Sequence, residues 1–225
     1  MPLRVRMCVR PAHHHLRRAI RAAGFFFFHF NKRPASALAF PIVQLHLRRG
    51  SLLSLAALLF WGGITIKLNF AKLEQSHITF LSDLLNEPTI ISALHSEIMD
   101  YAAWLDAYQT HWKNDTDEAH FIIFSDETPV GWLKLNGLDD NDVVWISMLV
   151  ISEQHQGKEY GCQAVAFSEA IAKERGFCTM GIHTTCDNFS AITLYLSCKY
   201  KITDYSKCTT GDGTNHMGYT FKKEI

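Results

Sequence analysis

One stretch of twelve residues, Val150–Gly161, constrains the fold of this chain more than any other. It reads V-I-S-E-Q-H-Q-G-K-E-Y-G: an apolar, β-branched run stops, a polar loop with two glycines follows, and a helical pattern begins after Gly161. A strand that leads through such a loop into a helix directs several backbone N–H groups to one point, where the helix dipole adds positive partial charge. The stretch therefore predicts a strand–loop–helix unit that binds phosphate.

The charged residues divide the chain into two parts. No Asp or Glu occurs before Glu74, whereas twelve of the 22 Lys and Arg lie in residues 1–73. The remainder holds 22 acidic and ten basic side chains, a formal charge of −12. We expect a basic, apolar leader over residues 1–65 and one folded domain over residues 66–225. An acidic domain without a basic face argues against nucleic acid as a partner.

The leader has three possible interpretations. Its apolar stretch, Ser51–Ile66, is shorter than the ~20 residues that span a bilayer and contains Gly62 and Gly63. A signal anchor is thus disfavoured, and membrane association is not expected. An Arg-rich, acid-free transit sequence is the second interpretation. The abrupt change in composition favours the third, a dispensable tail or an over-extended start.

The cysteines and histidines indicate neither disulfides nor a metal. Six cysteines include no C-x-x-C pair, and several lie in apolar segments, where a thiol packs as a small hydrophobe. This usage favours a reducing compartment, so we expect a cytoplasmic protein. His183 and Cys186 lack a second pair of ligands, so no metal is expected.

The hydrophobic pattern of the domain predicts the order β-α-α-β-β-β-α-β-α-β-β. Helices interleaved with a mostly antiparallel sheet give an α+β or mixed α/β fold. Ser76 is expected to cap the first helix, Pro88 to open a further turn, and Gly176 to end the helix after the loop. Strands are expected at residues 66–71, 121–124, 130–135, 143–151, 180–183, 200–205 and 217–221, and helices at 79–85, 101–112, 162–175 and 188–196.

Three segments, taken together, resemble the GNAT superfamily of N-acetyltransferases. Gln156–Gly161 resembles the Q/R-x-x-G-x-G/A loop with which the family holds the pyrophosphate of acetyl-CoA. Asn188–Tyr195 reads N-F-S-A-I-T-L-Y and resembles the family's N-x-x-A-x-x-L-Y segment. Leu149–Ile151 lies where the family's fourth strand binds the pantetheine arm. The resemblance covers residues 66–225 and implies a twisted, mostly antiparallel sheet flanked by helices.

The resemblance implies a transfer of the acetyl group of acetyl-CoA to a primary amine of a small molecule or peptide. The amine would attack the thioester directly in a ternary complex, and Tyr195 would protonate or hydrogen-bond the departing thiolate. A homodimer is possible. The alternative is an acyl-CoA-binding module of the same fold without turnover. The implied cofactor-binding residues are Leu149, Val150, Ile151, Gln156, Gly157, Lys158, Glu159, Tyr160, Gly161 and Asn188.

Two residues depart from the family pattern. Glu159 replaces the first motif glycine of the loop, and Lys199 replaces a glycine before an aromatic residue, here Tyr200. If Glu159 requires a positive φ, strain of ~1–3 kcal/mol follows. A carboxylate ~4 Å from a phosphate adds ~1 kcal/mol of repulsion in water and ~4 kcal/mol near a protein surface.

The sequence leaves the general base and the acceptor site open. The fourth strand offers Trp145 and Ser147 where some relatives place a Glu, and a water chain could also serve. Cys162 is expected to pack rather than to react. An acidic domain weakly favours a cationic amine. Candidate bases are Glu153, Asp140 and Asp142, and candidates for the acceptor pocket are Trp104, His111, Trp112, Trp132, Glu97 and Asp100.

Overall fold

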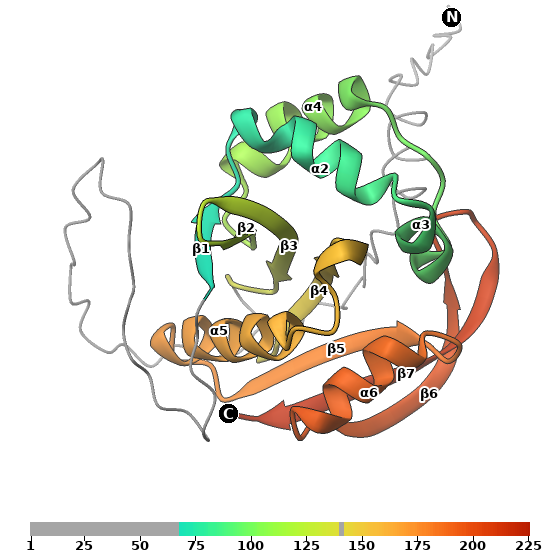
Figure 1. Ribbon diagram of the computed structural model, residues 1–225. Helices are drawn as coiled ribbons and strands as arrows, with labels where there is room; N and C mark the ends of the chain where they lie inside the picture. Colours follow the sequence, from blue (N-terminus) through green and yellow to red (C-terminus); the bar gives the residue numbers. More distant parts are fainter. Residues whose placement is uncertain (1–67, 140–141) are drawn as a thin grey trace, which may run out of the picture.

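The computed structural model describes residues 68–139 and 142–225 (Figure 1). The expected leader, with its apolar stretch Ser51–Ile66, and the candidate base Asp140 lie outside the described residues. Among the described helices, none combines the length and the apolar composition needed to cross a membrane.

A single mixed sheet of seven strands organises the described chain, in the spatial order β1-β2-β3-β4-β5-β7-β6. Every neighbouring pair is antiparallel except β4 and β5, which run parallel. The expected mixed α/β fold is thereby confirmed. The strands are β1 (Asn69–Lys72), β2 (Glu118–Ser125), β3 (Thr128–Asn136), β4 (Val144–Ile151), β5 (Thr179–Thr185), β6 (Lys201–Thr209) and β7 (Asn215–Glu224).

Helices cover both faces of the sheet (Figure 1). One buried cluster packs the first three helices against β2, β3 and β4, and a second packs α5 and α6 against the other face. Three helices separate β1 from β2 where the sequence predicted two, because the turn opened by Pro88 continues as a short helix. The helices are α2 (Ile78–Leu85), α3 (Pro88–Leu94), α4 (Tyr101–Thr110), α5 (Tyr160–Glu174) and α6 (Phe189–Ser197), with 3₁₀ turns η1 (Gln75–His77), η2 (Trp112–Asn114) and η3 (Glu153–His155).

Of the helix ends predicted from single residues, the end of α5 was correct and the cap of the first helix was not. Gly176 ends α5 with φ 87°, and the next residue, Phe177, donates its N–H to the Ala172 carbonyl at 3.0 Å, which confirms the predicted C′ position. Ser76 was wrongly predicted as a cap. It lies inside η1, which Glu74 caps through a reciprocal pair with His77.

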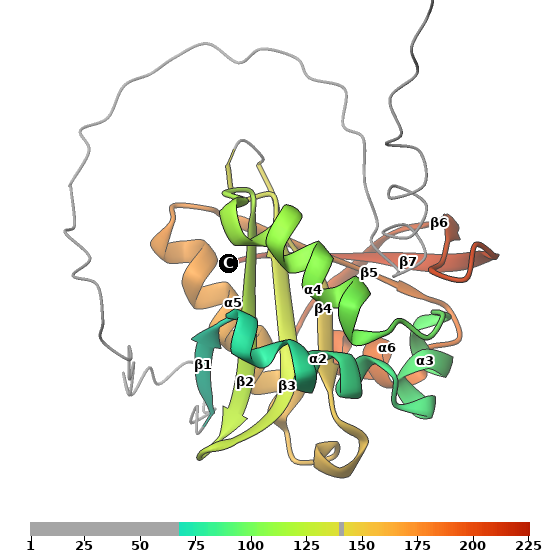
Figure 2. The same cartoon turned by 90° about the horizontal axis from the view of Figure 1, so that it is seen from above.

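A bulge in β4 divides the sheet. Lys134 of β3 lies opposite Met148 whereas Leu135 lies opposite Ile146, so Ser147 is the extra residue. Pairing of β4 with β5 involves only Val144, Trp145 and Ile146, and it stops where the bulge begins. Figure 2 shows the result: β5, β6 and β7 run in a clearly different direction from β2, β3 and β4. The two halves of the sheet therefore diverge along the second half of β4.

Candidate functional site

The second half of β4 has one edge that no strand occupies within residues 68–139 and 142–225. Leu149, Val150 and Ile151 pair with β3 on one side, and none of them pairs with β5 on the other side. Successive peptide groups of a strand alternate between its two edges. This edge therefore presents N–H and C=O groups to the region where the two halves of the sheet separate. A close approach fixes its position: a Cβ on Gly131 would lie 2.4 Å from the Val150 carbonyl oxygen.

The loop that follows β4 folds back onto the end of that strand. The Gln156 side-chain amide donates to the Ile151 carbonyl at 2.9 Å, and the Gln156 backbone N–H donates to the Glu153 carbonyl at 3.2 Å. Gly157 has φ 74°, a conformation that glycine adopts without strain. The loop thus turns sharply and aims the chain into α5.

The N-terminus of α5 has no side-chain cap. Its N-cap residue is Glu159, which lies in the left-handed region at φ 63° and ψ 10° and makes no capping hydrogen bond. The condition under which strain was expected at this position, a positive φ, is therefore met. The first amides of a helix have no intrahelical partner, so an uncapped N-terminus leaves N–H groups available to an anion. Glu159 and Lys158 are exposed.

Two residues at the start of α5 hold the helix in place. The Tyr160 hydroxyl lies 2.9 Å from the Ser125 hydroxyl at the end of β2, which holds the Tyr160 side chain against the sheet. The backbone N–H of Tyr160 is in the first turn of α5, where amides have no intrahelical partner. A Cβ on Gly161 would lie 2.9 Å from a methyl group of Leu194. The absence of a side chain at Gly161 therefore allows the N-terminal turn of α5 to lie against α6.

Helix α6 begins at Asn188, as the sequence predicts. The Asn188 side-chain oxygen accepts from the Ala191 N–H at 3.1 Å, and its amide donates to the Ala93 carbonyl at 3.4 Å. Asn188 thus caps α6 and links it to the end of α3. Ala191, Leu194 and Tyr195 all pack against the core, which confirms that they share one face of the helix.

Tyr195 is a buried tyrosine with 6% of its surface exposed. Its ring lies among aromatic residues, with centroids 5.8 Å from Phe221 and 6.4 Å from Tyr200. Burial, with a smaller contribution from Cys198, raises the pKa of the Tyr195 phenol above its ordinary value. The phenol therefore stays protonated at neutral pH and can donate a hydrogen bond.

The tryptophans expected in the acceptor pocket are core residues instead. Trp104, Trp112 and Trp132 are each less than 10% exposed and belong to the cluster between α2–α4 and the sheet. Trp112 stacks on His120 with centroids 4.6 Å apart and lies 5.9 Å from Trp132. Sequence alone could not separate these alternatives, since a tryptophan at a helix–sheet contact and one in a pocket follow the same periodicity.

The other predicted acceptor residues lie at the surface. His111, Glu97 and Asp100 are exposed, and the Asp100 carboxylate caps α4 by accepting from the Ala103 N–H at 2.8 Å.

A buried ionic cluster beside the tryptophans was not predicted. Glu118 pairs with Lys134 at 2.7 Å and with His120 at 3.2 Å, and the Lys134 and His120 side chains are 4% exposed. Burial lowers the pKa of His120, so its imidazole is neutral. Glu118 and His120 are two residues apart in β2 and therefore lie on the same face of the strand. His120 lies opposite Lys134 on β3. The two-residue spacing of charged or titratable side chains within a predicted strand is the sequence signal that could have identified this cluster.

The candidate bases occupy peripheral or structural positions. Glu153 accepts a hydrogen bond from the Thr89 hydroxyl at 3.2 Å, and Asp142 is exposed. Trp145 covers Gly181, where an added Cβ would lie 2.6 Å from the indole ring. Cys162 lies 3.8 Å from the Ser197 hydroxyl at the end of α6.

Comparison with known proteins agrees with this arrangement. The model of the acetyltransferase (GNAT) family matches residues 81–200, which is more than half of the chain. No curated protein sequence matches this chain.

Several solved structures share the fold. Spermidine N-acetyltransferase from Vibrio cholerae, in complex with CoA and spermine, has 17% identity and a TM-score of 0.63 over 70% of this chain and 95% of its own. A Salmonella typhimurium acetyltransferase that modifies the N-terminal serine of ribosomal protein L7/L12 has 16% identity and a TM-score of 0.62 over 72% and 96%. An aminoglycoside acetyltransferase in complex with CoA has 15% identity and a TM-score of 0.59 over 70% and 94%. At such identities the likeness shows the fold.

Proposed function

Since this chain belongs to the GNAT family of acetyltransferases, we propose that it transfers the acetyl group of acetyl-CoA to a primary amine of a small molecule or peptide. The observation that carries the proposal is the position of the uncapped N-terminus of α5, directly after the unpaired edge of β4. One end of this arrangement suits a diphosphate, and the other suits an extended amide chain. Acetyl-CoA contains both.

The cofactor would bind along this line through backbone groups. The amides of residues 157–161 would hold the pyrophosphate, and Lys158 would add a positive charge. The free edge of β4 at Leu149, Val150 and Ile151 would pair with the amides of the pantetheine arm, as an added strand does. Asn188 would contribute indirectly, by holding α6 and its residue Tyr195 beside the bound cofactor.

The transfer itself would depend on positioning. The amine nitrogen attacks the thioester carbonyl, the new C–N bond forms, the C–S bond breaks, and the proton of the amine passes through solvent to the CoA sulfur. Backbone N–H groups of β4 would stabilise the oxyanion. Because the pKa of Tyr195 is raised, its phenol is a weaker acid than a thiol of pKa ~8.5, so Tyr195 would hydrogen-bond the thiolate without giving up its proton.

The acceptor class follows from charge. The comparison proteins act on a polyamine, a protein N-terminus and an aminoglycoside, all of which are amines. The charge of −12 over residues 74–225 would steer a cationic amine to this chain. Five free cysteines in the described part of the chain support a reducing, cytoplasmic location. A homodimer is part of the proposal, and one structure of the Vibrio spermidine enzyme is dodecameric.

A second candidate function is an acyl-CoA-binding module without turnover. The replacement of the first motif glycine by the left-handed Glu159 favours it, as a sign that the cofactor loop has departed from that of an active enzyme. Two measurements on the full chain separate the candidates: the affinity for CoA by calorimetry, and the release of thiol from acetyl-CoA in the presence of spermidine or an aminoglycoside.

Tyr195→Phe tests the transfer step. It preserves the packing of the ring, and we expect kcat to fall about 100-fold while the Kd for CoA stays within twofold. Tyr200→Phe is the matched control, since Tyr200 lies in the same core and its hydroxyl bonds the Met180 sulfur at 3.7 Å. Equal kcat in the two variants would remove Tyr195 from the mechanism, and CoA binding without turnover in the unaltered protein would support the binding module.

A further inference from the structure

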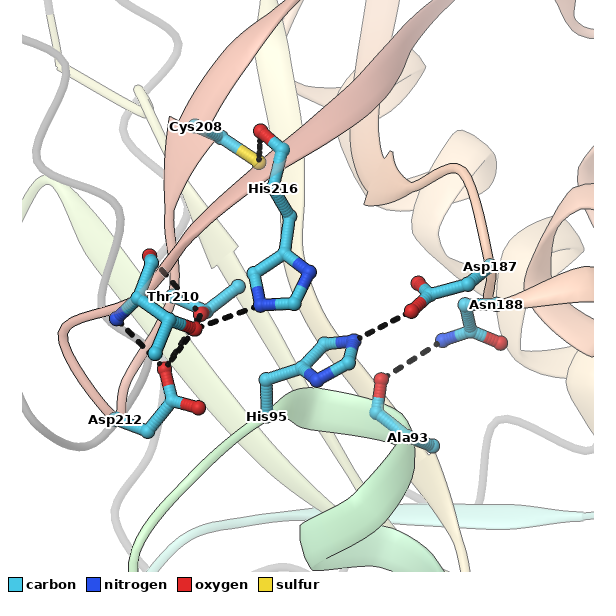
Figure 3. A network of polar contacts seen from close by, with 9 residues as sticks. Ala93, His95, Asp187, Asn188, Cys208, Thr210, Asp212 and His216 are labelled. Atoms are coloured by element: carbon cyan, nitrogen blue, oxygen red, sulfur yellow. Dashed lines mark hydrogen bonds and ion pairs between the residues drawn. The ribbon is translucent and has the colours of Figure 1, made fainter.

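Three segments far apart in the sequence bring two histidines and a carboxylate together beside α6 (Figure 3). His95 follows α3, Asp187 lies in the turn between β5 and α6, and His216 lies near the start of β7. The candidate ligand atoms of the three side chains lie within 4.8 Å of one another. The cluster adjoins Asn188 but includes none of the residues assigned above to acetyl-CoA.

The imidazole rings are arranged face to face. The ring centroids of His95 and His216 are 3.9 Å apart with 27° between the planes, and His95 Nε2 lies 3.0 Å from Asp187 Oδ2. Figure 3 shows the Asp187 carboxylate on the side of both rings where a ring nitrogen points outward. Stacked imidazoles beside a carboxylate leave three lone-pair donors around one point.

A chain of hydrogen bonds fixes the proton on His216. The Asp212 carboxylate can only accept, so the Thr214 hydroxyl, 2.7 Å away, donates to it. That hydroxyl therefore accepts from His216 Nε2, also at 2.7 Å. With its proton on Nε2, a neutral His216 has its lone pair on Nδ1. A ligating histidine in proteins commonly donates its other ring N–H to such a second partner.

The backbone also holds the cluster in shape. His95 ends α3 in the left-handed region at φ 47°, a conformation that is strained for a non-glycine residue. Its carbonyl accepts from the Asp212 N–H at 2.9 Å, which links α3 to the β6–β7 turn. Asn188 links α6 to α3 through the Ala93 carbonyl. The elements that carry the three side chains are thus joined by hydrogen bonds to main-chain carbonyls of Ala93 and His95.

We propose that His95, Asp187 and His216 bind a divalent transition-metal ion, with Zn²⁺ as the best match. Two imidazole nitrogens and one carboxylate oxygen, with a fourth position for water, are a common zinc ligand set. Ligands 2.0–2.2 Å from one ion lie about 3–3.5 Å apart, so side-chain shifts of about an ångström complete the site. The ion would clamp α3 and the β6–β7 turn onto the N-terminus of α6. This proposal replaces the expectation of no metal.

Calorimetric titration of the full chain with Zn²⁺ in a non-chelating buffer tests the proposal. We expect one equivalent that is lost in His95→Gln and in His216→Gln and is kept in His111→Gln, the matched control, because His111 is an exposed histidine outside the cluster. The consecutive histidines His13–His15 are unchanged in all four proteins, so any binding there is common to them.

Two further measurements do not depend on a ligand variant being folded. Thr214→Val removes only the partner of His216, and we expect zinc to bind 10–100-fold more weakly. X-ray absorption of the zinc-loaded, unaltered protein should show nitrogen and oxygen neighbours only. Sulfur neighbours at about 2.3 Å, identical titrations for the four proteins, or no zinc binding by the unaltered chain would each overturn the proposal.

Discussion

Replacing Glu159 with glycine should improve both the stability of the chain and its affinity for CoA. The backbone effect comes from φ 63°. A left-handed L-residue costs about 1–2 kcal/mol, which glycine avoids, but glycine also loses about 0.5–1 kcal/mol more conformational entropy on folding. The net gain is about 0.5–1 kcal/mol, which corresponds to a rise in Tm of about 2 °C for a domain of this size.

The effect on affinity comes from charge. A carboxylate 4–8 Å from a phosphate in water repels it by about 0.5–1 kcal/mol, and the exposure of Glu159 supports this solvent-screened range. Removal of that charge should lower the Kd for CoA about twofold to fivefold. The gain should shrink as salt is added, because screening weakens the repulsion that is removed.

Two matched variants separate the contributions. Glu159→Gln removes the charge and keeps the side chain in the left-handed conformation, so it should tighten CoA binding without raising Tm. Lys199→Gly relieves a second left-handed residue, at φ 70°, which follows α6 and is not part of the loop. It should raise Tm by a similar amount and leave the Kd unchanged. Calorimetry with CoA and thermal unfolding measure both quantities on the full chain.

A single pattern of results would refute this reasoning. If Glu159→Gly and Glu159→Gln both left the Kd for CoA unchanged at low salt, the loop would not hold the pyrophosphate. A loss of affinity in Glu159→Gly alone would mean that the loop needs the rigidity of an L-residue more than it suffers from the strain.

Three further predictions concern packing and buried charge. Gly131→Ala should destabilise the chain by about 1–3 kcal/mol in urea and weaken CoA binding, because the new methyl group displaces Val150 on β4; an unchanged m-value and midpoint would refute the close approach. Lys223→Met should cost about 3–5 kcal/mol, because it leaves the 2%-exposed Glu169 without the ammonium group 2.8 Å away, and Glu169→Gln in the same chain should restore most of the loss. Burial lowers the pKa of His120, so below pH ~6.5 the unfolded chain binds more protons than the folded chain, and the free energy of unfolding falls as the pH falls through that value. His120→Gln should therefore reduce the slope of the free energy of unfolding against pH, measured between pH 7 and 5.5, by up to about 1.4 kcal/mol per pH unit.

Local patterns were sufficient for much of the fold. Period-two and helical spacing located the strands and helices, because those periods reflect which side chains face the core. Asn188 was identified as a helix cap and Gly176 as a C′ residue because such positions depend only on a few neighbouring groups. Ser76 was misassigned because Glu74 offers a competing cap two residues earlier.

The loop between β4 and α5 was predicted from residue order, but its conformation was not. The sequence could state only that a positive φ at Glu159 would be costly, and the structure shows that φ is 63°. The roles of Tyr195 and of the loop residues in binding and transfer stay predictions. The tryptophans were misplaced because burial depends on α4 packing over the sheet, which no local pattern encodes.

The sequence by itself determined the order of the strands, the end of α5, the start of α6 and the loop that joins β4 to α5, because each depends on residues within one or two turns of one another. Only the tertiary structure decided which distant groups meet. The bulge at Ser147 ends the pairing of β4 with β5, the β2–β3 register joins Glu118 to Lys134, and three separate turns bring His95 to His216. These contacts join residues from 16 to 121 positions apart, and packing of the whole sheet and its helices sets them.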